Sequence, residues 1–288
     1  MRTGDALMAD IAACRVPAGE CVFWWLGQHS FAIKLGGTIV LADPFLSPLA
    51  GRRVKPLLKA EQVRGVSLVL GSHDHADHID RPAWPALAAA NPEALFAVPA
   101  PVAPALGRAL GLDGKRLLGL NAGESLTHGG VTVWAVPAAH ERLDRDPQTG
   151  AYPYLGFVVK GNGVTLYHAG DTCLYEGIHE RLRAHRPDIL FLPINGRDAK
   201  RLRGGCIGNM TYQEAADLAG ALESALTVPA HFEMFAGNME DPALFADYMA
   251  VKYPGLRVVV PEHGARTRVV LGGLAVTVQV EEGNSRGS

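Results

Sequence analysis

Short apolar runs, separated by glycine, proline and asparagine, dominate the hydrophobic pattern of this chain. Residues 66–70 are an example, because this run is rich in β-branched and aliphatic side chains and ends at Gly71. Such runs are typical of buried strands bounded by turns. The pattern predicts strands at 22–26, 31–35, 38–42, 66–70, 95–98, 117–120, 124–127, 131–136, 155–160, 164–168, 188–192, 225–228, 258–260, 267–271 and 274–280.

Several segments between the strands carry helix signals. Thr211 is followed three residues later by Glu214, which is the pattern of a capping box at a helix start. Asn91 and Pro92 end another helix, because a proline disfavours helical backbone at the residue before it. Helices are predicted within 1–17, at 60–64, at 83–90, within 99–110, at 211–224 and at 242–252.

No linker or repeat divides the chain, so the pattern predicts one domain spanning residues 1–288, with a core from about 20 to 281. The polar residues 281–288 are expected to form a frayed tail. Hydrophobic residues make up 48% of the chain and charged residues 19%, as in an ordinary globular enzyme. Strands interspersed with helices predict a mixed α and β fold.

The charge balance narrows the range of partners. A net charge of −2 gives no global attraction to nucleic acid or to an anionic membrane, so neither is expected as a partner and any anion binding must be local. Residues 1–16 have no sustained apolar run, and no segment is apolar and long enough to span a bilayer. Four cysteines without a Cys-x-x-Cys pair predict reduced thiols in a cytoplasmic protein. Homo-oligomer formation is left open.

Three histidines and three aspartates fall within residues 72–80, directly after a predicted strand. Neutral imidazole and carboxylate groups are the nitrogen and oxygen ligands of zinc and similar divalent ions. His73 and His75 are two positions apart, so their rings point the same way on an extended segment. Asp77 and His78 follow in the turn. Because one ion needs only about three or four ligands, this loop predicts two ions side by side; the alternative is a solvated polar loop.

Three further strand ends carry residues of the same types. His140 follows a predicted strand, Asp171 follows a glycine in a turn, and His231 comes after a short strand and a proline. Each alone is a weak signal, because a buried histidine is more often structural and an aspartate after a glycine usually forms a turn. His263 is a rival candidate for a late ligand.

The segment Ser-His-Asp-His-Ala-Asp-His at 72–78 resembles the signature loop of the metallo-β-lactamase superfamily of binuclear metallohydrolases. The resemblance implies an α+β fold, the four-layer αββα sandwich. The later histidines and aspartate occupy the order that the superfamily shows, which gives them weight that none has alone. The resemblance implies that one ion is held by His73, His75 and His140, and the other by Asp77, His78 and His231. It also implies that Asp171 binds both ions. His263 is the rival of His231 as the last ligand.

Further motifs resemble one branch of this superfamily. Residues 25–31, 193–197, 208–211 and 229–235 are similar to the L-ascorbate-6-phosphate lactonase-like branch, and the match spans roughly residues 22 to 262. The resemblance implies hydrolysis of a small, anionic substrate such as a sugar-lactone phosphate. Fold and metals alone say little about substrate, because one fold hosts many reactions.

The resemblance also implies a mechanism. Two divalent ions, zinc or manganese with iron as a further option, share a hydroxide that attacks the substrate. Asp77 is the candidate to relay a proton while serving as a ligand. Asp43 and Asp80 are candidates to orient ligand histidines, and the alternative is that they only form turns or caps.

Substrate contacts are predicted at His29, Asn195 and Arg197. Arg197 shares one loop with Lys200, Arg201 and Arg203, which predicts a phosphate-binding flap or, equally, a solvated surface loop. His168 is expected near the site without being a ligand.

Three other functions remain as alternatives. One is phosphodiester cleavage, including RNA, although the chain has no basic stripe interleaved with aromatic residues. Another is the di-iron redox use of this fold, whose branch carries glutamate at the position of His75. The last is a metal-holding scaffold without turnover, which the complete ligand set disfavours.

Overall fold

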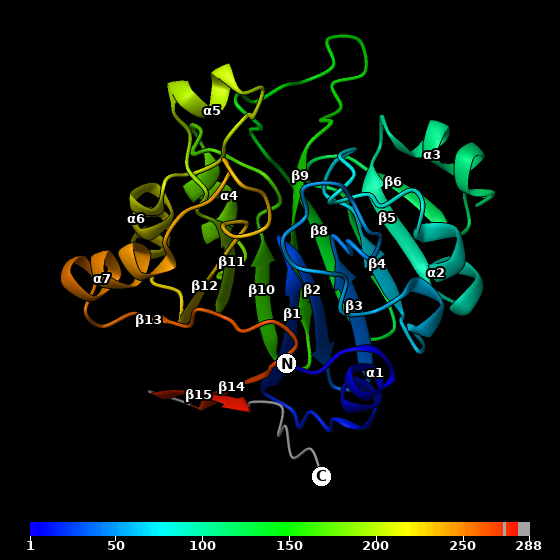
Figure 1. Cartoon of the computed structure of the whole chain (residues 1–288), viewed down its shortest axis with the longest axis horizontal. Helices are drawn as coiled ribbons and strands as arrows, with labels where there is room; N and C mark the ends of the chain where they lie inside the picture. Colours follow the sequence, from blue (N-terminus) through cyan, green and yellow to red (C-terminus); the bar gives the residue numbers. More distant parts are fainter. Residues whose placement is uncertain (273–274, 282–288) are drawn as a thin grey trace.

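Two mixed β-sheets form the inner layers of the protein (Figure 1). The computed structural model describes residues 1–272 and 275–281. Within them, the first sheet has eight strands in the order β15-β14-β1-β2-β3-β4-β5-β6. These are β1 (Glu20–Gly27), β2 (Ser30–Leu35), β3 (Thr38–Ala42), β4 (Leu68–Leu70), β5 (Leu95–Pro99), β6 (Leu117–Leu120), β14 (Arg266–Gly272) and β15 (Ala275–Glu281).

The second sheet has seven strands among the described residues, in the order β13-β12-β11-β10-β9-β8-β7. These are β7 (Ser125–His128), β8 (Val131–Pro137), β9 (Leu155–Gly161), β10 (Val164–His168), β11 (Ile189–Pro193), β12 (Leu226–Ala230) and β13 (Arg257–Val258). Strands β10 to β13 run parallel, as do β3 to β6 in the first sheet.

Helices cover the outer faces of both sheets (Figure 1). The first sheet is flanked by α1 (Gly4–Ala13), α2 (Trp84–Ala90) and α3 (Ala103–Leu110), together with the short 3₁₀ helix η1 (Ala60–Gln62). The second sheet is flanked by α4 (Ile178–Arg183), α6 (Tyr212–Leu222) and α7 (Pro242–Lys252), and α5 (Ala199–Arg203) lies beyond its end. The predicted α+β class and αββα sandwich are therefore confirmed.

Strand β1 shows why the strands of the first sheet are apolar without a break. Alternate side chains of a strand point to opposite faces of a sheet. Phe23 faces the other sheet, where its ring centroid lies 5.1 Å from that of Phe191. Trp24 faces outward and packs in the cluster that contains Leu7 of α1 and Trp84 of α2. Both faces of the strand are buried, so neither has room for polar residues.

Helix α1 belongs to the core, although the sequence prediction placed the core boundary after it. The predicted helix within 1–17 is observed at Gly4–Ala13, and its Leu7, Met8 and Ile11 side chains are buried against the first sheet. The ammonium group of Lys34 donates hydrogen bonds of 2.8 Å to backbone carbonyl oxygens of α1, including that of Ile11. These contacts fasten the N-terminal helix to β2.

Two short helices, α4 and α5, are absent from the sequence prediction. Helix α5 forms inside the segment predicted as a basic flap, and Asp198 caps it by accepting hydrogen bonds from the backbone N–H groups of Lys200 and Arg201. A helix of this length is too short to show an apolar period, so only its cap could have signalled it.

The other predicted elements are found within a few residues of their expected bounds. The last predicted strand is observed as β15, but its first residue, 274, lies outside the described residues. Glu281, predicted to begin the frayed tail, ends β15, and the rest of that tail, 282–288, lies outside the description as well. Across the described ranges no helix is long and apolar enough to cross a membrane, and all four cysteines are free thiols.

Strand directions bring many strand ends to one edge of the sandwich. Strands β3 and β4 are parallel, so their carboxyl ends lie together. Strands β8 and β10 are both antiparallel to β9, so they run in the same direction, and β11 and β12 follow β10 in parallel. The loops that follow these strands carry the residues that the sequence singled out.

Candidate metal centre

The seven predicted ligand residues come together at this edge. They form overlapping groups in which the candidate ligand atoms all lie within 4.8 Å of one another. The loop after β4 supplies four of them, and the loops after β8, β10 and β12 supply one each. The groups are His73 with His75 and His140, His73 with His78 and Asp171, and Asp77 with His78 and His231.

The loop after β4 is compact because its backbone turns twice within a few residues. The N–H of His75 donates to the carbonyl oxygen of His73 (3.0 Å), and the N–H of His78 donates to that of His75 (3.0 Å). Gly71 precedes the loop, where a Cβ atom would lie only 2.7 Å from Ile79 and from Trp84. Glycine at this position lets the loop fold back onto α2.

The first group is a cluster of three imidazole rings. His73 Nε2 lies 2.9 Å from His75 Nδ1, and the ring of His140 lies 5.1 Å and 4.9 Å from the rings of His73 and His75. The ring of Tyr154 stands beside this group, with its centroid 5.0 Å from that of His140. Three neutral nitrogen ligands in this arrangement suit a zinc-like cation.

The second group combines a carboxylate with two imidazole rings. Asp77 Oδ2 lies 3.7 Å from His78 Nε2 and 3.8 Å from His231 Nε2. The rings of His78 and His231 are stacked, with centroids 5.5 Å apart. His231 adopts a left-handed backbone conformation (φ 59°), which points its side chain back from the end of β12 into the cluster.

Asp171 lies between the two groups. Its Oδ1 atom is 3.3 Å from His78 Nε2, and its Oδ2 atom is 3.2 Å from His231 Nε2 and 3.7 Å from His140 Nε2. One carboxylate therefore faces members of both groups, because Oδ2 faces His140 of the first group and His231 of the second, and Oδ1 faces His78. A carboxylate in this position could be shared by two cations, because it offers two accepting oxygens.

Unpaired polar atoms test whether the residues fit a cation. His78 Nε2 and Asp171 Oδ1 are both buried and have no hydrogen-bond partner, although they lie next to each other. A buried polar atom without a partner is costly, and a cation at this position would satisfy both atoms. The donor set of histidine nitrogen and carboxylate oxygen is also the one that divalent transition metals prefer.

The electrostatics differ between the two groups. Burial lowers the pKa of His73 well below its ordinary value and also lowers that of His140, so both rings are neutral and can bind a cation. Burial alone would raise the pKa of Asp171, but the neighbouring His231 and His78 hold it well below its usual range. For His78, burial lowers the pKa, but Asp171 and other carboxylates outweigh burial and raise it to about 10. The His78 ring therefore holds a proton beside Asp171, which a bound cation would displace.

Gly170 sets the position of Asp171. Its φ is +59°, and an added Cβ atom would lie 2.6 Å from the carbonyl oxygen of Leu155 and 2.7 Å from Ser72 Cβ. Replacing Gly170 with alanine is expected to lower the free energy of unfolding by at least about 2 kcal/mol, because strain and overlap add. Thermal and urea unfolding measure the loss.

The matched control for this prediction is Gly205→Ala. Gly205 also has a positive φ (77°), but no atom lies within 4 Å of an added Cβ. Only backbone strain remains there, so the loss should stay near 1 kcal/mol. Equal losses in the two variants would contradict a role for the close approach at Gly170.

Asp43 follows β3 and orients a ligand histidine, which is one of the two roles that the sequence analysis offered for it. Its Oδ2 atom lies 2.6 Å from His78 Nδ1 and accepts a hydrogen bond from the Ser72 hydroxyl (2.7 Å). Its Oδ1 atom accepts from the Ser72 N–H (2.7 Å). Asp43 therefore fixes the ring orientation of His78 from behind and leaves Nε2 facing the cluster.

Asp80, the other candidate for this task, does something else. Its carboxylate accepts hydrogen bonds from the N–H groups of Leu46 and Ser47, and from the Ser47 hydroxyl. It makes no hydrogen bond to a ligand histidine. The expectation that Asp80 orients a ligand is wrong, and the alternative of a turn-forming carboxylate is correct for this residue.

His29 and His168 lie beneath the cluster, and both are fully buried. Their rings are 4.1 Å apart, and His29 Nδ1 is 4.0 Å from Asp171 Oδ1. Burial lowers the pKa of His29 to about 4, so the ring is neutral. The expectation that His168 lies near the site is met, but the prediction that His29 contacts substrate is wrong, because a ring without exposed surface cannot touch one.

Asn195 and Arg197 are also engaged with the protein itself. The side chain of Asn195 is fully buried, donates to Asn238 (2.7 Å) and accepts from Asn209 (3.1 Å). The guanidinium of Arg197 pairs with both carboxylate oxygens of Glu214, at 2.5 and 2.6 Å, and joins α5 to the start of α6. The predicted substrate contact at Asn195 is therefore corrected to a structural one. The contact at Arg197 stays a prediction, because its side chain is 40% exposed and lines a hollow that begins at Glu141.

His263 lies outside the ligand cluster. Its ring stacks on Trp25 with centroids 4.1 Å apart, and its Nε2 atom lies 3.2 Å from Glu233 Oε1. His231, by contrast, is in the second group. The geometry therefore favours His231 over His263 as the candidate late ligand.

Two residues near the cluster escaped the sequence prediction. The side-chain nitrogen of Gln28 donates to Asp77 Oδ2 (2.7 Å) and lies 3.0 Å from His231 Nε2. Arg52 packs its guanidinium over the ring of Phe45, and burial lowers its pKa to about 10 against the opposing charges of Asp80, Glu233 and Asp77. Gln28 lies in the Gly-Gln-His-Ser turn that the sequence had marked, but no pattern signals the position of Arg52 in a proline-interrupted loop.

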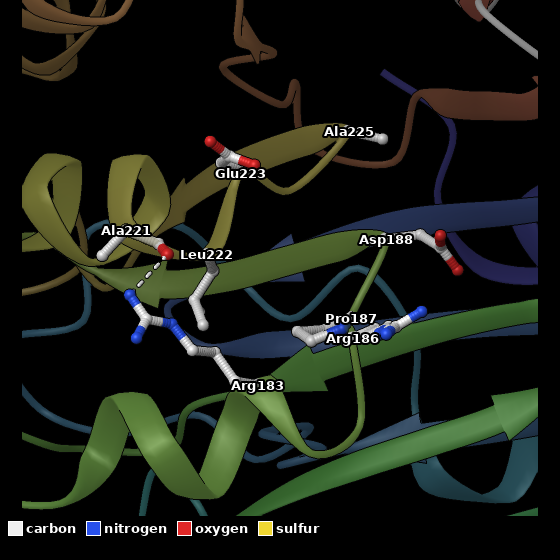
Figure 2. Close-up of a pocket in the computed structure, with 8 residues that line it drawn as sticks. All are labelled: Arg183, Arg186, Pro187, Asp188, Ala221, Leu222, Glu223 and Ala225. Carbon is white, nitrogen blue, oxygen red and sulfur yellow. Dashed lines mark hydrogen bonds between the residues drawn. The ribbon is translucent and has the colours of Figure 1, made fainter.

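A separate hollow of about 560 Å³ lies at the opposite ends of β11 and β12 (Figure 2). Its lining combines the cations Arg183 and Arg186 with the acids Asp188 and Glu223, and Arg183 donates to the carbonyl oxygen of Ala221 (3.2 Å). None of the predicted ligand residues lines it. Because its charges are of both signs and partly engaged, we assign it no role in the chemistry.

Comparison with known proteins agrees with this fold and site. A family model described as a beta-lactamase superfamily domain matches residues 38–232. The chain therefore belongs to the metallo-β-lactamase superfamily. The matched range includes all seven candidate ligand residues.

Curated relatives show which family within the superfamily the chain belongs to. The chain is 30% identical over 240 residues to a UPF0173 metal-dependent hydrolase of Archaeoglobus fulgidus, covering 82% of this chain and 93% of the relative. It is 29% identical over 243 residues to a protein of the same description from Caldivirga maquilingensis, covering 83% and 94%. The protein is thus a member of the UPF0173 metal-dependent hydrolase family.

Solved structures share the fold at lower identity. A metallo hydrolase from Ignicoccus hospitalis superposes with a TM-score of 0.65 at 21% identity, covering 88% of this chain and all of that one. An isothiocyanate hydrolase from Delia radicum gut bacteria superposes with a TM-score of 0.66 at 20% identity, covering 85% and 98%. A diiron β-hydroxylase from Streptomyces venezuelae has a TM-score of 0.66 at 16% identity, covering 89% and 55%. The same fold therefore occurs in proteins described by different chemistry.

Proposed function

We propose that this protein is a binuclear metal-dependent hydrolase of small, anionic substrates with an electrophilic carbonyl group, such as a sugar-lactone phosphate. The observation that carries the proposal is the position of Asp171, which faces His140 of one ligand group and His78 and His231 of the other. Two groups joined by one carboxylate are what two cations in one site require. Zinc and manganese both suit these donors, and iron is compatible with them.

Divalent cations bound here would lower the pKa of a water molecule and polarise the oxygen of the scissile bond. The protein residues orient these cations and handle protons. Asp77 has 19% of its side chain exposed, against 5% for Asp171, so it is the carboxylate that can exchange a proton with solvent. Asp77 is therefore the proposed proton relay, as the sequence suggested, and Tyr154 stands next to the first group as a further polar contact.

The hollows beside the ligand cluster support a small, anionic substrate. The segment after α5 passes directly over the Asp171 turn, because the N–H of Met210 donates to the carbonyl oxygen of Thr172 (2.9 Å). Two hollows share Cys206 of this segment. One, of about 210 Å³, begins beside His140 at Glu141, and its wall combines the apolar Leu202 and Ile207 with the charged Arg197 and Asp198.

The other hollow, of about 450 Å³, lies on the side of His231. It is lined by Phe235 and the residues after it, and by Lys200 and Arg201 of α5. Arg201 is paired with Asp198, whereas the exposed ammonium of Lys200 forms no ion pair within the described residues. Lys200 thus joins Arg197 as a proposed contact for a phosphate or carboxylate. Apolar wall and cations in the two hollows suit a small anionic ester.

Metal content and a substrate panel test the proposed function. The purified protein is stripped with a chelator, reloaded with zinc or manganese, and assayed on lactone phosphates, simple lactones, phosphodiesters, isothiocyanates and β-lactams. We expect about two metal ions per chain and hydrolysis of the anionic lactones that disappears on stripping. Phosphodiester cleavage without lactone hydrolysis would overturn the substrate class. Bound metal without turnover of any substrate would favour the scaffold alternative.

Reversing the charge of Lys200 tests the hollow that it lines. The substitution Lys200→Glu is expected to raise the Michaelis constant for an anionic lactone about tenfold and to leave that for a neutral lactone unchanged. The control is Arg203→Glu, an equal charge reversal on the same helix, at an exposed residue that lines neither hollow. Its Michaelis constant should stay within about twofold of the wild-type value. An equal rise in both variants would show only a general charge effect.

A further inference from the structure

The side chain of Gln28 contacts two candidate ligands of the same cation, Asp77 and His231. Its Nε2 atom lies 2.7 Å from Asp77 Oδ2 and 3.0 Å from His231 Nε2. These two ligand atoms are 3.8 Å apart. When two ligand atoms each lie about 2.1 Å from one cation, a spacing of this size between them is geometrically possible. The amide group of Gln28 therefore contacts the same pair of atoms that a cation in the second group would join.

The main chain holds Gln28 in this place. Its N–H donates to Glu233 Oε1 (2.8 Å), and its carbonyl oxygen accepts from the Trp25 indole N–H (2.9 Å) and from the His231 N–H (3.1 Å). The residue is 2% exposed and has a φ of 54°, in the left-handed region. A non-glycine residue rarely adopts this conformation unless its surroundings enforce it. The turn thus fixes the side chain relative to both ligand loops.

The chemistry of the amide suits two charge states of the site. An ionised Asp77 carboxylate can only accept hydrogen bonds, so without a cation the NH₂ end of Gln28 must face it. The same NH₂ end can donate to His231 Nε2 when the proton of that ring is on Nδ1, which is also the tautomer that binds a cation through Nε2. The oxygen and nitrogen ends of an amide are nearly equal in size. A half-turn of the amide therefore exchanges a donor for an acceptor without a change in packing.

We propose that Gln28 belongs to the second cation position. When no cation is bound, its NH₂ group bridges Asp77 and His231. When a cation is bound, its Oε1 atom contacts that cation. This inference rests on the proposed two-cation site. It predicts that Gln28 controls the affinity for the second cation specifically. The first group, His73 with His75 and His140, does not include any atom that Gln28 contacts.

Stepwise binding of Co²⁺ tests the inference without any assay of activity. The chelator-stripped protein is titrated by calorimetry and by visible absorption, which responds to the number and type of ligands around bound Co²⁺. In Gln28→Leu, which keeps the volume and removes the amide, the second dissociation constant should rise by about 10- to 100-fold. The first should stay within about twofold. In Gln28→Glu, the added negative charge should instead tighten the second site about tenfold.

Two further variants guard against trivial explanations. Gln28→Asn keeps an amide and suits the left-handed backbone, but it is too short to reach Asp77 and His231, so it should weaken the second site as leucine does. Gln148→Leu makes the same change at an exposed loop residue and should alter neither site. Melting temperatures of the stripped proteins report folding.

The outcomes separate the two proposals. Unchanged binding of both ions by Gln28→Leu and Gln28→Asn would overturn the role of Gln28 and leave the two-cation site intact. An equal loss of both ions would assign Gln28 a general structural role instead. A wild-type protein that takes up only one Co²⁺ ion would overturn the two-cation site and this inference with it.

Discussion

Replacing Asp171 with asparagine is expected to lower the rate of hydrolysis by at least about 1,000-fold, because this change removes the one carboxylate that faces both ligand groups. Asparagine has nearly the same shape, but it carries no charge and only one of its two side-chain ends can accept. The contacts of 3.3 Å to His78 and 3.2 Å to His231 could then no longer both be made to an anionic oxygen. Steady-state kinetics of the metal-loaded protein and its metal content measure the effect.

The control for this substitution is Asp113→Asn. Asp113 lies in an exposed turn, where its carboxylate accepts hydrogen bonds from the N–H groups of Lys115 and Arg116. That variant should retain wild-type rates and metal content. If Asp171→Asn keeps two metal ions and more than about one tenth of the wild-type rate, Asp171 does not serve both groups.

The second large effect is expected at Asp43. The Asp43–His78 contact of 2.6 Å joins two side chains that are both fully buried. Breaking a buried pair leaves the remaining polar atom without a partner, so Asp43→Asn should lower the free energy of unfolding by about 3 kcal/mol. Because His78 also loses its fixed orientation, affinity for the second cation should fall by about 10- to 100-fold. Urea unfolding and Co²⁺ titration measure the two losses.

The backbone at Asp43 makes asparagine the informative replacement. Asp43 has a positive φ of 44°, a conformation that asparagine tolerates better than most residues do. The substitution therefore removes charge without adding backbone strain. Asp247→Asn, at an exposed residue of α7, is the control and should leave the stability at the wild-type value. Wild-type stability in Asp43→Asn would mean that the buried contact contributes nothing to folding.

The two ligand groups differ in how the fold supports them. The second group is held by Asp43 behind His78 and by Gln28 beside Asp77. In the first group, His75 is exposed, and Nδ1 of His140 is buried without a partner, as is Nδ1 of His231 in the second group. Substitutions at Asp43 and Gln28 should therefore act mainly on cation affinity at the second position.

The sequence identified the ligand loop and most of the strands, and there are local physical reasons for this success. The central strands are apolar runs because both of their faces are buried, as the alternation of Phe23 and Trp24 between two cores shows. The loop from His73 to His78 holds its ligand types within a few residues, so no knowledge of the fold is needed to see them. Asp43 was recognisable as a candidate only because it ends a predicted strand.

Other features depend on contacts between distant parts of the chain. His29 and Asn195 have the right chemistry and lie near the right strand ends, yet both are fully buried, with His29 beneath Asp171 and Asn195 bonded to Asn209. Gln28 and Arg52 carry no pattern of their own. Whether a polar side chain points to the protein or to a substrate is decided by its neighbours in space, which a linear pattern does not contain.

By itself, the residue pattern determined a mixed α and β fold and the concentration of metal-binding side chains after β4, because apolar periodicity and ligand spacing are local properties. The layered sandwich was implied by the family resemblance. Only the tertiary structure decided that His140, Asp171 and His231 meet this loop, that His231 rather than His263 joins them, and that Asp80 does not. These choices depend on strand directions, on which loop ends share one edge, and on which polar atoms are already paired. Such facts arise when the two sheets pack together, and residue spacing does not encode them.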